Sequence, residues 1–203
     1  MPRSKHILYI SYDGMTDPLG QSQVIPYLKA LTQKGFSFSI LSFEKPAAFR
    51  NRKAFIQQEL DEAGIAWYPL TYTKRPPVLS TLYDLWRMRQ KARAILKEQQ
   101  PVIIHARSYL PAMVGLHLKK TFGSKLLFDM RGFWADERVD GGLWSLHNPV
   151  YRMIYRYVKR QEKRLLDESD HVVSLTQAGK RIIHERQDLA HQPVPITVIP
   201  TCV

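Results

Sequence analysis

The sequence predicts an α/β fold, in which a doubly wound, mainly parallel sheet of about seven strands carries helices on both faces. Short apolar runs alternate with amphipathic segments along the chain, without interruption as far as residue 129. Several runs contain consecutive Val, Ile or Leu residues, which is typical of strands buried on both faces. The 203 residues, 44% of them hydrophobic, are enough for one large core. Because strand and helix alternate, right-handed crossovers should keep the strands parallel.

The strands are predicted from the apolar runs, and the helices from apolar residues at helical spacing. The seven expected strands cover residues 6–10, 36–42, 66–70, 102–105, 125–129, 172–175 and 196–199. The expected helices cover residues 21–34, 47–63, 82–96, 109–122 and 149–167, and a further helix starts at residue 176. Ser22 is the expected N-cap of the first helix and Gly35 its end. Residues 130–147 are expected to be irregular.

The first loop, residues 13–23, is rich in turn-forming residues and connects a strand to a helix. Gly14 and Gly20 allow the backbone to turn sharply, and Pro18 lies between them. A helix that starts beyond Gly20 would direct free amide groups outward with a partial positive charge, which attracts phosphate. The glycine spacing matches neither the dinucleotide-binding fingerprint nor the P-loop. A phosphate site and a plain connection between strand and helix therefore both fit this loop.

The charge balance is strongly basic, because 30 Lys and Arg residues face 18 Asp and Glu residues and the net charge is +12. This charge implies an acidic partner, for which nucleic acid, an anionic membrane surface and a phosphorylated substrate all qualify. No apolar run is long enough for a membrane span or a signal peptide, so we expect a cytoplasmic protein. The single cysteine, Cys202, allows neither an internal disulfide nor a zinc cluster, which fits a reducing compartment.

Candidate site residues follow the ends of predicted strands, where ligands of such sheets bind. His105 is expected at the tip of the fourth strand, where it can face a ligand or be held by structural hydrogen bonds. Residues 128–138 follow the fifth strand and combine two arginines, three carboxylates and aromatic side chains. Arginine can bind phosphate or carboxylate, and a carboxylate can orient a sugar hydroxyl or accept a proton. The same side chains can instead pair with one another on a surface loop.

Residues 149–167 are predicted to form a basic amphipathic helix. The apolar side carries Val150, Ile154, Tyr157, Val158, Leu165 and Leu166, and the basic side carries Arg152, Arg156, Lys159, Arg160 and Lys163. Such a helix can lie on anionic lipid headgroups, although a solvated charged face over a packed apolar stripe is the commoner case and the interpretation we favour. The sequence contains no HExxH, paired CxxC or GxSxG motif, and no nucleic-acid recognition pattern, so we do not expect nucleic acid as the partner.

Four segments together resemble the amino-terminal half of family 4 glycosyltransferases, and the resemblance covers essentially the whole chain. They are residues 13–23, 105–108, 129–138 and 198–203. The resemblance implies a GT-B architecture, in which two Rossmann-like domains face each other and bind the acceptor and the nucleotide-sugar donor. It also implies retention of anomeric configuration, without a bound metal or cofactor. Residues 1–203 are then expected to form the single Rossmann-like acceptor-side domain, with residues 198–203 starting the linker to a donor-binding domain that the chain lacks.

The resemblance also suggests roles for individual residues. Gly20 matches the family glycine whose backbone approaches the donor diphosphate, and Gln21 and Gly14 are added as donor contacts. Arg131 stands where many members carry a histidine, so anion recognition is expected there because a guanidinium is a poor base. The expected acceptor contacts are Asp13, Arg107, Ser108, Arg131, Asp136, Glu137 and Arg138. No catalytic residue is assigned, and Arg131 and His105 are the candidates for such a role.

These inferences predict the acceptor-binding domain of a retaining glycosyltransferase. The full enzyme would transfer a sugar from a nucleotide-sugar donor to a cell-envelope glycan or lipid-linked acceptor, in the cytoplasm and peripherally at the inner face of the plasma membrane. We expect the fragment alone to be inactive, because the family's donor-binding residues belong to the second domain. The alternative is a non-enzymatic basic module of the same fold that binds an anionic membrane surface or polymer, and the net charge and the basic helix favour it.

Overall fold

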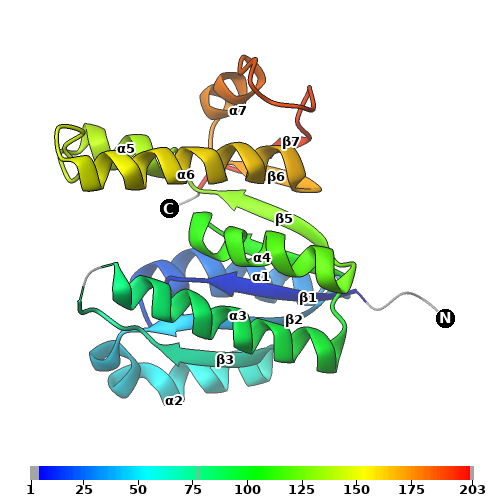
Figure 1. The fold of residues 1–203 in the computed structure, drawn as a ribbon. Coiled ribbons are helices and arrows are strands. Elements are labelled where there is room, and N and C mark those ends of the chain that lie inside the picture. Colours follow the sequence, from blue (N-terminus) through cyan, green and yellow to red (C-terminus); the bar gives the residue numbers. More distant parts are fainter. Residues whose placement is uncertain (1–4, 77, 202–203) are drawn as a thin grey trace.

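The computed structural model describes residues 5–76 and 78–201 and contains one seven-stranded sheet, in which every strand runs parallel to its neighbours. The strand order is β3-β2-β1-β4-β5-β6-β7 (Figure 1). The strands are β1 (His6–Ser11), β2 (Ser37–Glu44), β3 (Ala66–Thr71), β4 (Ile103–Arg107), β5 (Lys125–Met130), β6 (His171–Ser174) and β7 (Ile196–Val198). The predicted parallel, doubly wound sheet is therefore confirmed. Cys202 and Val203, the end of the predicted linker, lie outside the described residues.

Helices cover both faces of the sheet, as predicted. They are the π-helical turn η1 (Gly20–Val24), α1 (Ile25–Thr32), α2 (Pro46–Glu62), α3 (Leu79–Gln99), α4 (Tyr109–Phe122), α5 (Trp134–Asp140), α6 (Pro149–Glu168) and α7 (Gln177–His184). Helices α1 and α2 pack on one face, whereas α3, α4, α6 and α7 contribute to the core of the other face. Among the described residues, no helix is both long enough and apolar enough to cross a bilayer.

Two apolar cores result because successive strand residues point to opposite faces of the sheet. In β1, Leu8 and Ile10 belong to the larger core under α3, α4 and α6, and Ile7 and Tyr9 belong to the smaller core under α1 and α2. The larger core extends across the sheet as far as Ile196 of β7. The buried side chains of the smaller core come from β1, β2 and β3, from η1, α1 and α2, and from the loop residues Met15 and Ile65. On the same face of the sheet as this smaller core, side chains of β4 and β5 border a cavity.

The opening loop differs from the prediction at the start of its helix. Helical residues begin at Pro18 and continue through η1, so the predicted start at residue 21 is wrong. Ser22 is not an N-cap, because its hydroxyl lies inside the π-helical turn and donates to the Pro18 carbonyl oxygen at 2.9 Å. Proline suits a first helical position, since the amide hydrogen that it lacks has no partner there. Because the first helical bond runs from the Gln21 amide to the Asp17 carbonyl oxygen, the free amides at the helix start are those of Leu19 and Gly20, rather than those of residues beyond Gly20.

Two further predictions are corrected. Residues 130–147 are not irregular throughout, because α5 forms within them. The apolar side of α6 is not a packed stripe along its whole length: Val158 and Leu165 are buried, but Val150 and Tyr157 are 53% and 54% exposed. The favoured interpretation of this helix therefore holds for its carboxy-terminal half alone.

The strand order reverses between β1 and β4, which are neighbours in the sheet. β1 leads into α1 and β2 on one side, and β4 leads into α4 and β5 on the other. At this edge the last residues of the two strands, Ser11 and Arg107, are register partners. Open α/β sheets bind ligands at such a switch point, outside the carboxyl ends of the strands. By this rule, the ligand site is expected at the ends of β1 and β4.

Candidate functional site

A cavity of about 250 Å³ lies at this switch point, on the face of the sheet that carries α1. Its walls come from four strands, from η1 and α1, and from the segment after β7. The lining residues are Tyr9, Ser22, Gln23, Tyr27, His105, Arg107, Asp129, Arg131, Val173, Ile199, Pro200 and Thr201. Segments that are far apart in the sequence thus meet around one half-open cavity, which contains charged side chains.

Two arginines converge on a single amide oxygen in this cavity. Nη2 of Arg107 and Nη2 of Arg131 each donate to Oε1 of Gln23 at 2.9 Å. Arg131 also donates to the hydroxyl of Thr201 at 2.9 Å. Guanidinium groups bind carboxylate and phosphate oxygens more strongly than a neutral amide oxygen, because those bonds are charge-assisted. The Gln23 oxygen therefore marks a position suited to an anionic oxygen.

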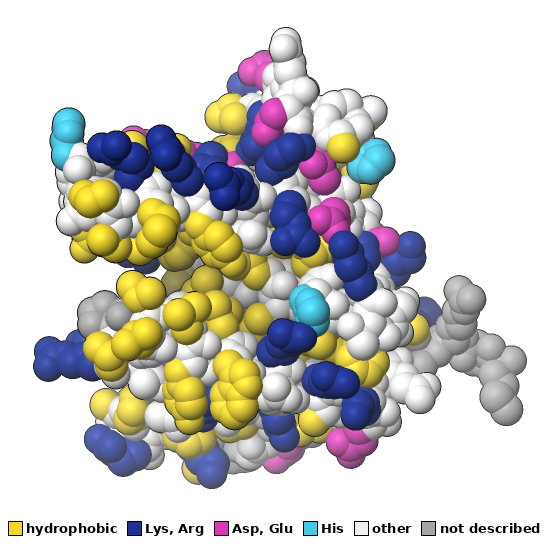
Figure 2. Space-filling model, in the orientation of Figure 1, with side chains coloured by type: hydrophobic (Ala, Val, Ile, Leu, Met, Phe, Trp, Pro, Cys, Tyr) yellow, Lys and Arg dark blue, Asp and Glu magenta, His cyan; other side chains and the backbone are white. Residues whose placement is uncertain are grey.

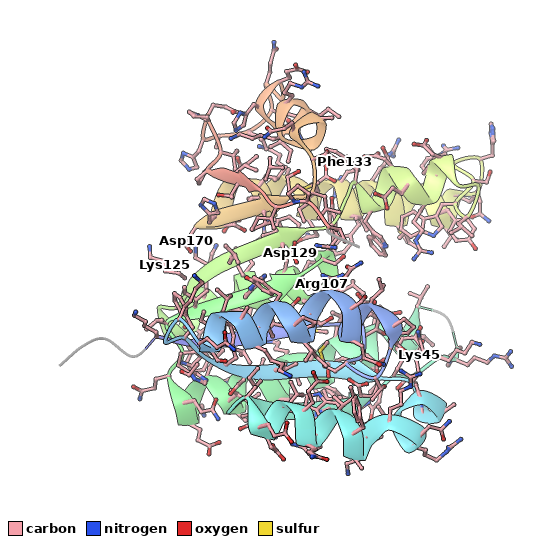
Figure 3. The ribbon with its side chains drawn as sticks, turned by 180° about the vertical axis from the view of Figure 1, so that it is seen from behind. Lys45, Arg107, Lys125, Asp129, Phe133 and Asp170 are labelled. Carbon is pink, nitrogen blue, oxygen red and sulfur yellow. The ribbon has the colours of Figure 1, made fainter. Side chains whose placement is uncertain are left out.

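Asp129 is the acidic counterpart of the two arginines. Its carboxylate lies 3.7 Å from Nη1 of Arg107 and 3.7 Å from Nη1 of Arg131, too far for hydrogen bonds (Figure 3). Burial raises the pKa of Asp129 above its ordinary value, and Arg131 and Arg107 oppose that rise. The ion pairs are thus loose, and both guanidinium groups keep binding capacity for another anion.

His105 is buried inside β4, two residues before its end, so the expected position at the strand tip is wrong. Its Nε2 lies 4.0 Å from Oδ2 of Asp129, and its ring packs edge-on against Tyr9 with centroids 4.6 Å apart. Burial, together with the charges of Arg107 and Arg131, lowers the pKa of His105 to about 3. The imidazole is therefore neutral at physiological pH and is a weak base.

Unpartnered polar atoms gather in the same place. Among the described residues, four buried side-chain atoms have no hydrogen-bond partner, and three of them are His105 Nε2, Arg107 Nε and Asp129 Oδ1. Buried polar groups are normally satisfied, because leaving one unpaired costs about 1–3 kcal/mol. Three such atoms around one cavity indicate a site shaped to bind a polar ligand.

The local sequence explains how Gln23 reaches the cavity. Gly20 packs against the loop itself, because a Cβ at this position would overlap the Gly14 carbonyl oxygen and lie 2.6 Å from Cα of Met15. The π-helical turn that begins at Gly20 contains Gln23, and such turns are frequent at functional sites. One turn later, Tyr27 presents its ring 6.1 Å from that of His105. Burial raises the pKa of Tyr27, with a contribution from Asp129, so its hydroxyl stays protonated.

The residues proposed as acceptor contacts fall into two groups. Arg107 and Arg131 line the cavity, and Asp13 stands at its edge, with Oδ2 3.5 Å from Nε of Arg107. Ser108 follows β4, and its amide donates to the Asp129 carbonyl oxygen at 2.9 Å. The other three belong to α5 and do not line the cavity. Asp136 is bound by Tyr155 and Lys159 at 2.8 Å each, Glu137 lies beside Gly132, and Arg138 stacks over Trp134.

The three residues proposed as donor contacts lie in the opening loop. Gly14 and Gly20 are both buried. The side chain of Gln21 donates to the Thr16 carbonyl oxygen at 2.8 Å and accepts from Arg52 at 2.6 Å. In this structure all three residues stabilise the loop, and their contact with a donor stays a prediction.

Several lining residues were missing from the sequence-based site. Tyr9, Gln23, Tyr27 and Thr201 reach the cavity from elements other than β4 and β5. Asp129 could have been included, since it is the strand-end carboxylate of the segment that supplied Arg131. The sequence carries no comparable signal for the other four, because their proximity depends on the strand order and on the π-helical turn.

Comparisons with known proteins identify the family and the fold of this chain. The family model of Glycosyltransferase Family 4 matches residues 22–203. Among solved structures, the chain is similar to sucrose-phosphate synthase from Thermosynechococcus elongatus, with a TM-score of 0.65 and 16% identity over 98% of this chain and 48% of that chain. It is also similar to a glycosyltransferase from Rickettsia africae, with a TM-score of 0.53 and 16% identity over 98% of this chain and 43% of that chain.

A third similar structure is HepE of Anabaena in complex with UDP and glucose, with a TM-score of 0.54 and 14% identity over 87% of this chain and 39% of that chain. None of the curated proteins compared with this chain matches it. The chain spans less than half the length of these three structures, and its fold is that of one half of a GT-B glycosyltransferase. Because the family model covers residues 22–203, the chain belongs to glycosyltransferase family 4.

Proposed function

We propose that this chain is the acceptor-side domain of a retaining glycosyltransferase, and that the switch-point cavity binds an anionic group of the acceptor. The observation that carries the proposal is the convergence of Arg107 and Arg131 on the Gln23 oxygen inside the switch-point cavity. An acceptor phosphate or carboxylate would replace the amide oxygen and form charge-assisted bonds with both guanidinium groups. A cell-envelope glycan or a lipid-linked precursor with a phosphate would supply such a group.

The donor would be a nucleotide-sugar held by a second domain outside this chain. HepE of Anabaena, which the chain resembles over 39% of that protein's length, was solved with UDP and glucose. We propose that a domain following residues 198–203 faces the carboxyl edge of the sheet and brings the donor close to the opening loop. Gly14, Gly20 and Gln21 would then contact the donor diphosphate through their backbone. On this proposal, the isolated chain does not transfer sugar.

The residues of this domain would mainly position the acceptor. A guanidinium is a poor base, and His105, with its pKa of about 3, is a weak one, so neither Arg131 nor His105 is suited to remove a proton from the attacking hydroxyl. A retaining displacement gains most from holding the two substrates in reactive geometry and from stabilising the charge of the leaving group. We propose no metal or cofactor for this step. Asp136, Glu137 and Arg138 stay predicted acceptor contacts outside the cavity.

The anion site can be tested on this chain by titration calorimetry with inorganic phosphate and with a soluble prenyl phosphate. Arg131→Ala should weaken binding of both by about 10- to 100-fold, because it removes a charge-assisted bond worth about 1.5–3 kcal/mol. Arg131→Lys should recover part of the affinity, since it keeps the charge but loses the forked geometry. Arg50→Ala, on the exposed surface of α2, is the matched control. Equal affinities for the wild-type chain and Arg131→Ala would refute the site.

The transferase function itself requires the protein that includes the donor domain. There, transfer of a radiolabelled sugar to a lipid-linked phosphate acceptor should fall in Arg131→Ala, and the anomeric configuration of the product, read by NMR, should match that of the donor. Glu137→Ala serves as a comparison for the α5 residues. If Glu137→Ala lowered acceptor affinity and Arg131→Ala did not, the acceptor would bind beside α5 rather than in the cavity.

A further inference from the structure

Most of the exposed large apolar side chains among the described residues lie on α3 and α6 or close to their starts. Ten of the 15 such side chains among the described residues belong to the start of α3, with the residue before it, and to residues 143–157. We define the α3–α6 surface by Leu79, Leu82 and Trp86 of α3 and by Val150, Met153 and Tyr157 of α6, which are 53% to 65% exposed. Soluble monomers rarely leave contiguous apolar patches of this kind uncovered.

A groove joins the α3 side and the α6 side of this surface. Trp86 and Tyr157 line the same groove, together with Met113 and Leu116 of α4, which lies between α3 and α6. Figure 2 shows hydrophobic side chains on both sides of this groove. An occupant of the surface would therefore touch both helices.

Basic side chains surround the surface, and acidic side chains are nearly missing from the segments that form it. Residues 63–97 contain one acid, Asp84, which is buried, and residues 141–161 contain none. Arg156 and Arg160 of α6 are exposed, and neither has an ion pair in the described part of the chain. Dark blue Lys and Arg side chains accordingly border the yellow area in Figure 2.

Exposed aromatic and apolar side chains bordered by basic ones suit the surface of an anionic membrane. Tryptophan and tyrosine favour the boundary between headgroups and acyl chains, and arginine reaches from such a surface to lipid phosphates. An amphipathic helix with exposed apolar and basic side chains lies in the plane of an anionic bilayer. We propose that the α3–α6 surface binds the headgroup layer of an anionic membrane. The inference is independent of the proposed transfer reaction, because it requires neither donor nor acceptor.

The location of the surface gives this binding a consequence. The amino-terminal ends of α3 and α6 lie at the edge of the sheet toward which the strands point (Figure 1). The arginine cavity opens at the same edge, because β4 and β5 end there. A membrane bound at the start of both helices would therefore lie at the end of the molecule where the cavity opens, and a lipid-linked anion could approach it laterally.

Vesicle co-sedimentation of this chain tests the proposal. The chain should sediment with vesicles of phosphatidylcholine and phosphatidylglycerol, and much less with phosphatidylcholine alone. Trp86→Ser with Tyr157→Ser should weaken binding to the vesicles by about tenfold or more, because the variant lacks two large apolar side chains that the membrane would bury. Arg156→Glu with Arg160→Glu should weaken it by about 30-fold or more, and added salt should weaken wild-type binding as well.

Matched controls separate this surface from general attraction by the net charge. Phe55→Ser removes an aromatic side chain that is 65% exposed on α2, and Arg50→Glu with Lys53→Glu makes the same charge change on α2. Both controls should bind within about twofold of the wild type. Thermal unfolding verifies that each variant is folded, and the two surface variants test the proposal independently of each other.

Three outcomes would overturn the proposal. The first is a wild-type chain that does not sediment with anionic vesicles at low salt. The second is a loss in the α2 controls as large as in the surface variants, which would indicate unspecific charge attraction. The third is a wild-type chain that is dimeric in sedimentation velocity, with the Trp86→Ser and Tyr157→Ser variant monomeric and vesicle binding unchanged, which would assign the surface to a second copy.

Discussion

The buried carboxylate of Glu44, at the end of β2, determines the shape of the opening loop, and its replacement by glutamine should be strongly destabilising. Oε1 accepts from the Met15 amide at 2.8 Å and from the Ser42 hydroxyl at 2.6 Å. Oε2 accepts from the Thr16 amide at 3.0 Å and from the Thr16 hydroxyl at 2.5 Å. Glu44→Gln keeps the size and shape of the side chain but turns one acceptor into a donor. At that position a backbone amide then faces another donor.

The magnitude follows from these contacts. A glutamine can rotate to leave its remaining oxygen on either backbone amide, but the other amide loses its acceptor inside the core. A lost hydrogen bond to a charged group costs about 1.5–3 kcal/mol, and a buried unpaired donor costs about 1–3 kcal/mol. We therefore expect the free energy of unfolding to fall by about 3–5 kcal/mol. For a chain of this size that corresponds to a decrease in melting temperature on the order of 10 °C.

The assay is urea denaturation followed by circular dichroism, with Glu59→Gln as the control. Glu59 forms a surface ion pair with Lys29 at 2.9 Å, and its neutralisation should cost at most about 1 kcal/mol. Both variants lose one negative charge, so the comparison cancels the effect of net charge. If Glu44→Gln unfolded within about 0.5 kcal/mol of Glu59→Gln, the hydrogen bonds to Glu44 would not hold the loop, and the explanation given for its shape would be wrong.

Two further predictions concern Gly20 and His105. Gly20→Ala should lower the free energy of unfolding by about 1–3 kcal/mol in the same assay, because the alanine Cβ would meet backbone atoms of Gly14 and Met15. This loss is expected although alanine is the better helix former. An unchanged or raised stability would contradict the prediction. His105 has a folded pKa of about 3, below its unfolded value of about 6.5, so its stabilising contribution is complete above pH 6.5 and is lost as the pH falls toward 3. Between pH 7 and pH 5 the wild-type chain should therefore lose about 2 kcal/mol more than His105→Gln, and parallel pH profiles would show that His105 is not buried as a neutral ring.

Most of the fold could be predicted from the sequence, because strands and helices leave different periodic patterns. The helix at residues 109–122 has the predicted bounds, and the seven strands lie where the apolar runs are. Helix α5 was missed because its seven residues, three of them acidic, show little apolar periodicity. The π-helical turn was missed because apolar periodicity does not distinguish a π-helical turn from an α-helical one. Periodicity also identified the apolar face of α6. It did not reveal that part of this face is exposed.

The site was predictable where it depends on strand ends and unpredictable where it depends on strand order. Arg107 and Arg131 end or follow β4 and β5, and the general rule for ligand sites in α/β sheets selected both. Gln23 and Thr201 come from elements at opposite ends of the sequence, and no sequence pattern indicates that both contact Arg131. Asp136 lies outside the cavity because Lys159 of α6 binds it, and the sequence does not reveal that partner.

The net charge of +12 suggested an acidic partner without selecting one, and the structure separates these charges into three groups. Some are neutralised within the fold: Lys159, for example, lies 2.8 Å from Asp136 and 2.6 Å from Glu162. Arg107 and Arg131 share one neutral amide oxygen, with Asp129 3.7 Å from each and Asp13 3.5 Å from Arg107, which suits a single small anion. A third group, which includes Arg156 and Arg160, is exposed on α6, the helix that also carries the exposed side chains of Met153 and Tyr157, which suits an extended anionic surface. Because the second and third groups share no residue, the proposed anion binding in the cavity and the proposed adhesion to a membrane should be removed separately by the variants described above.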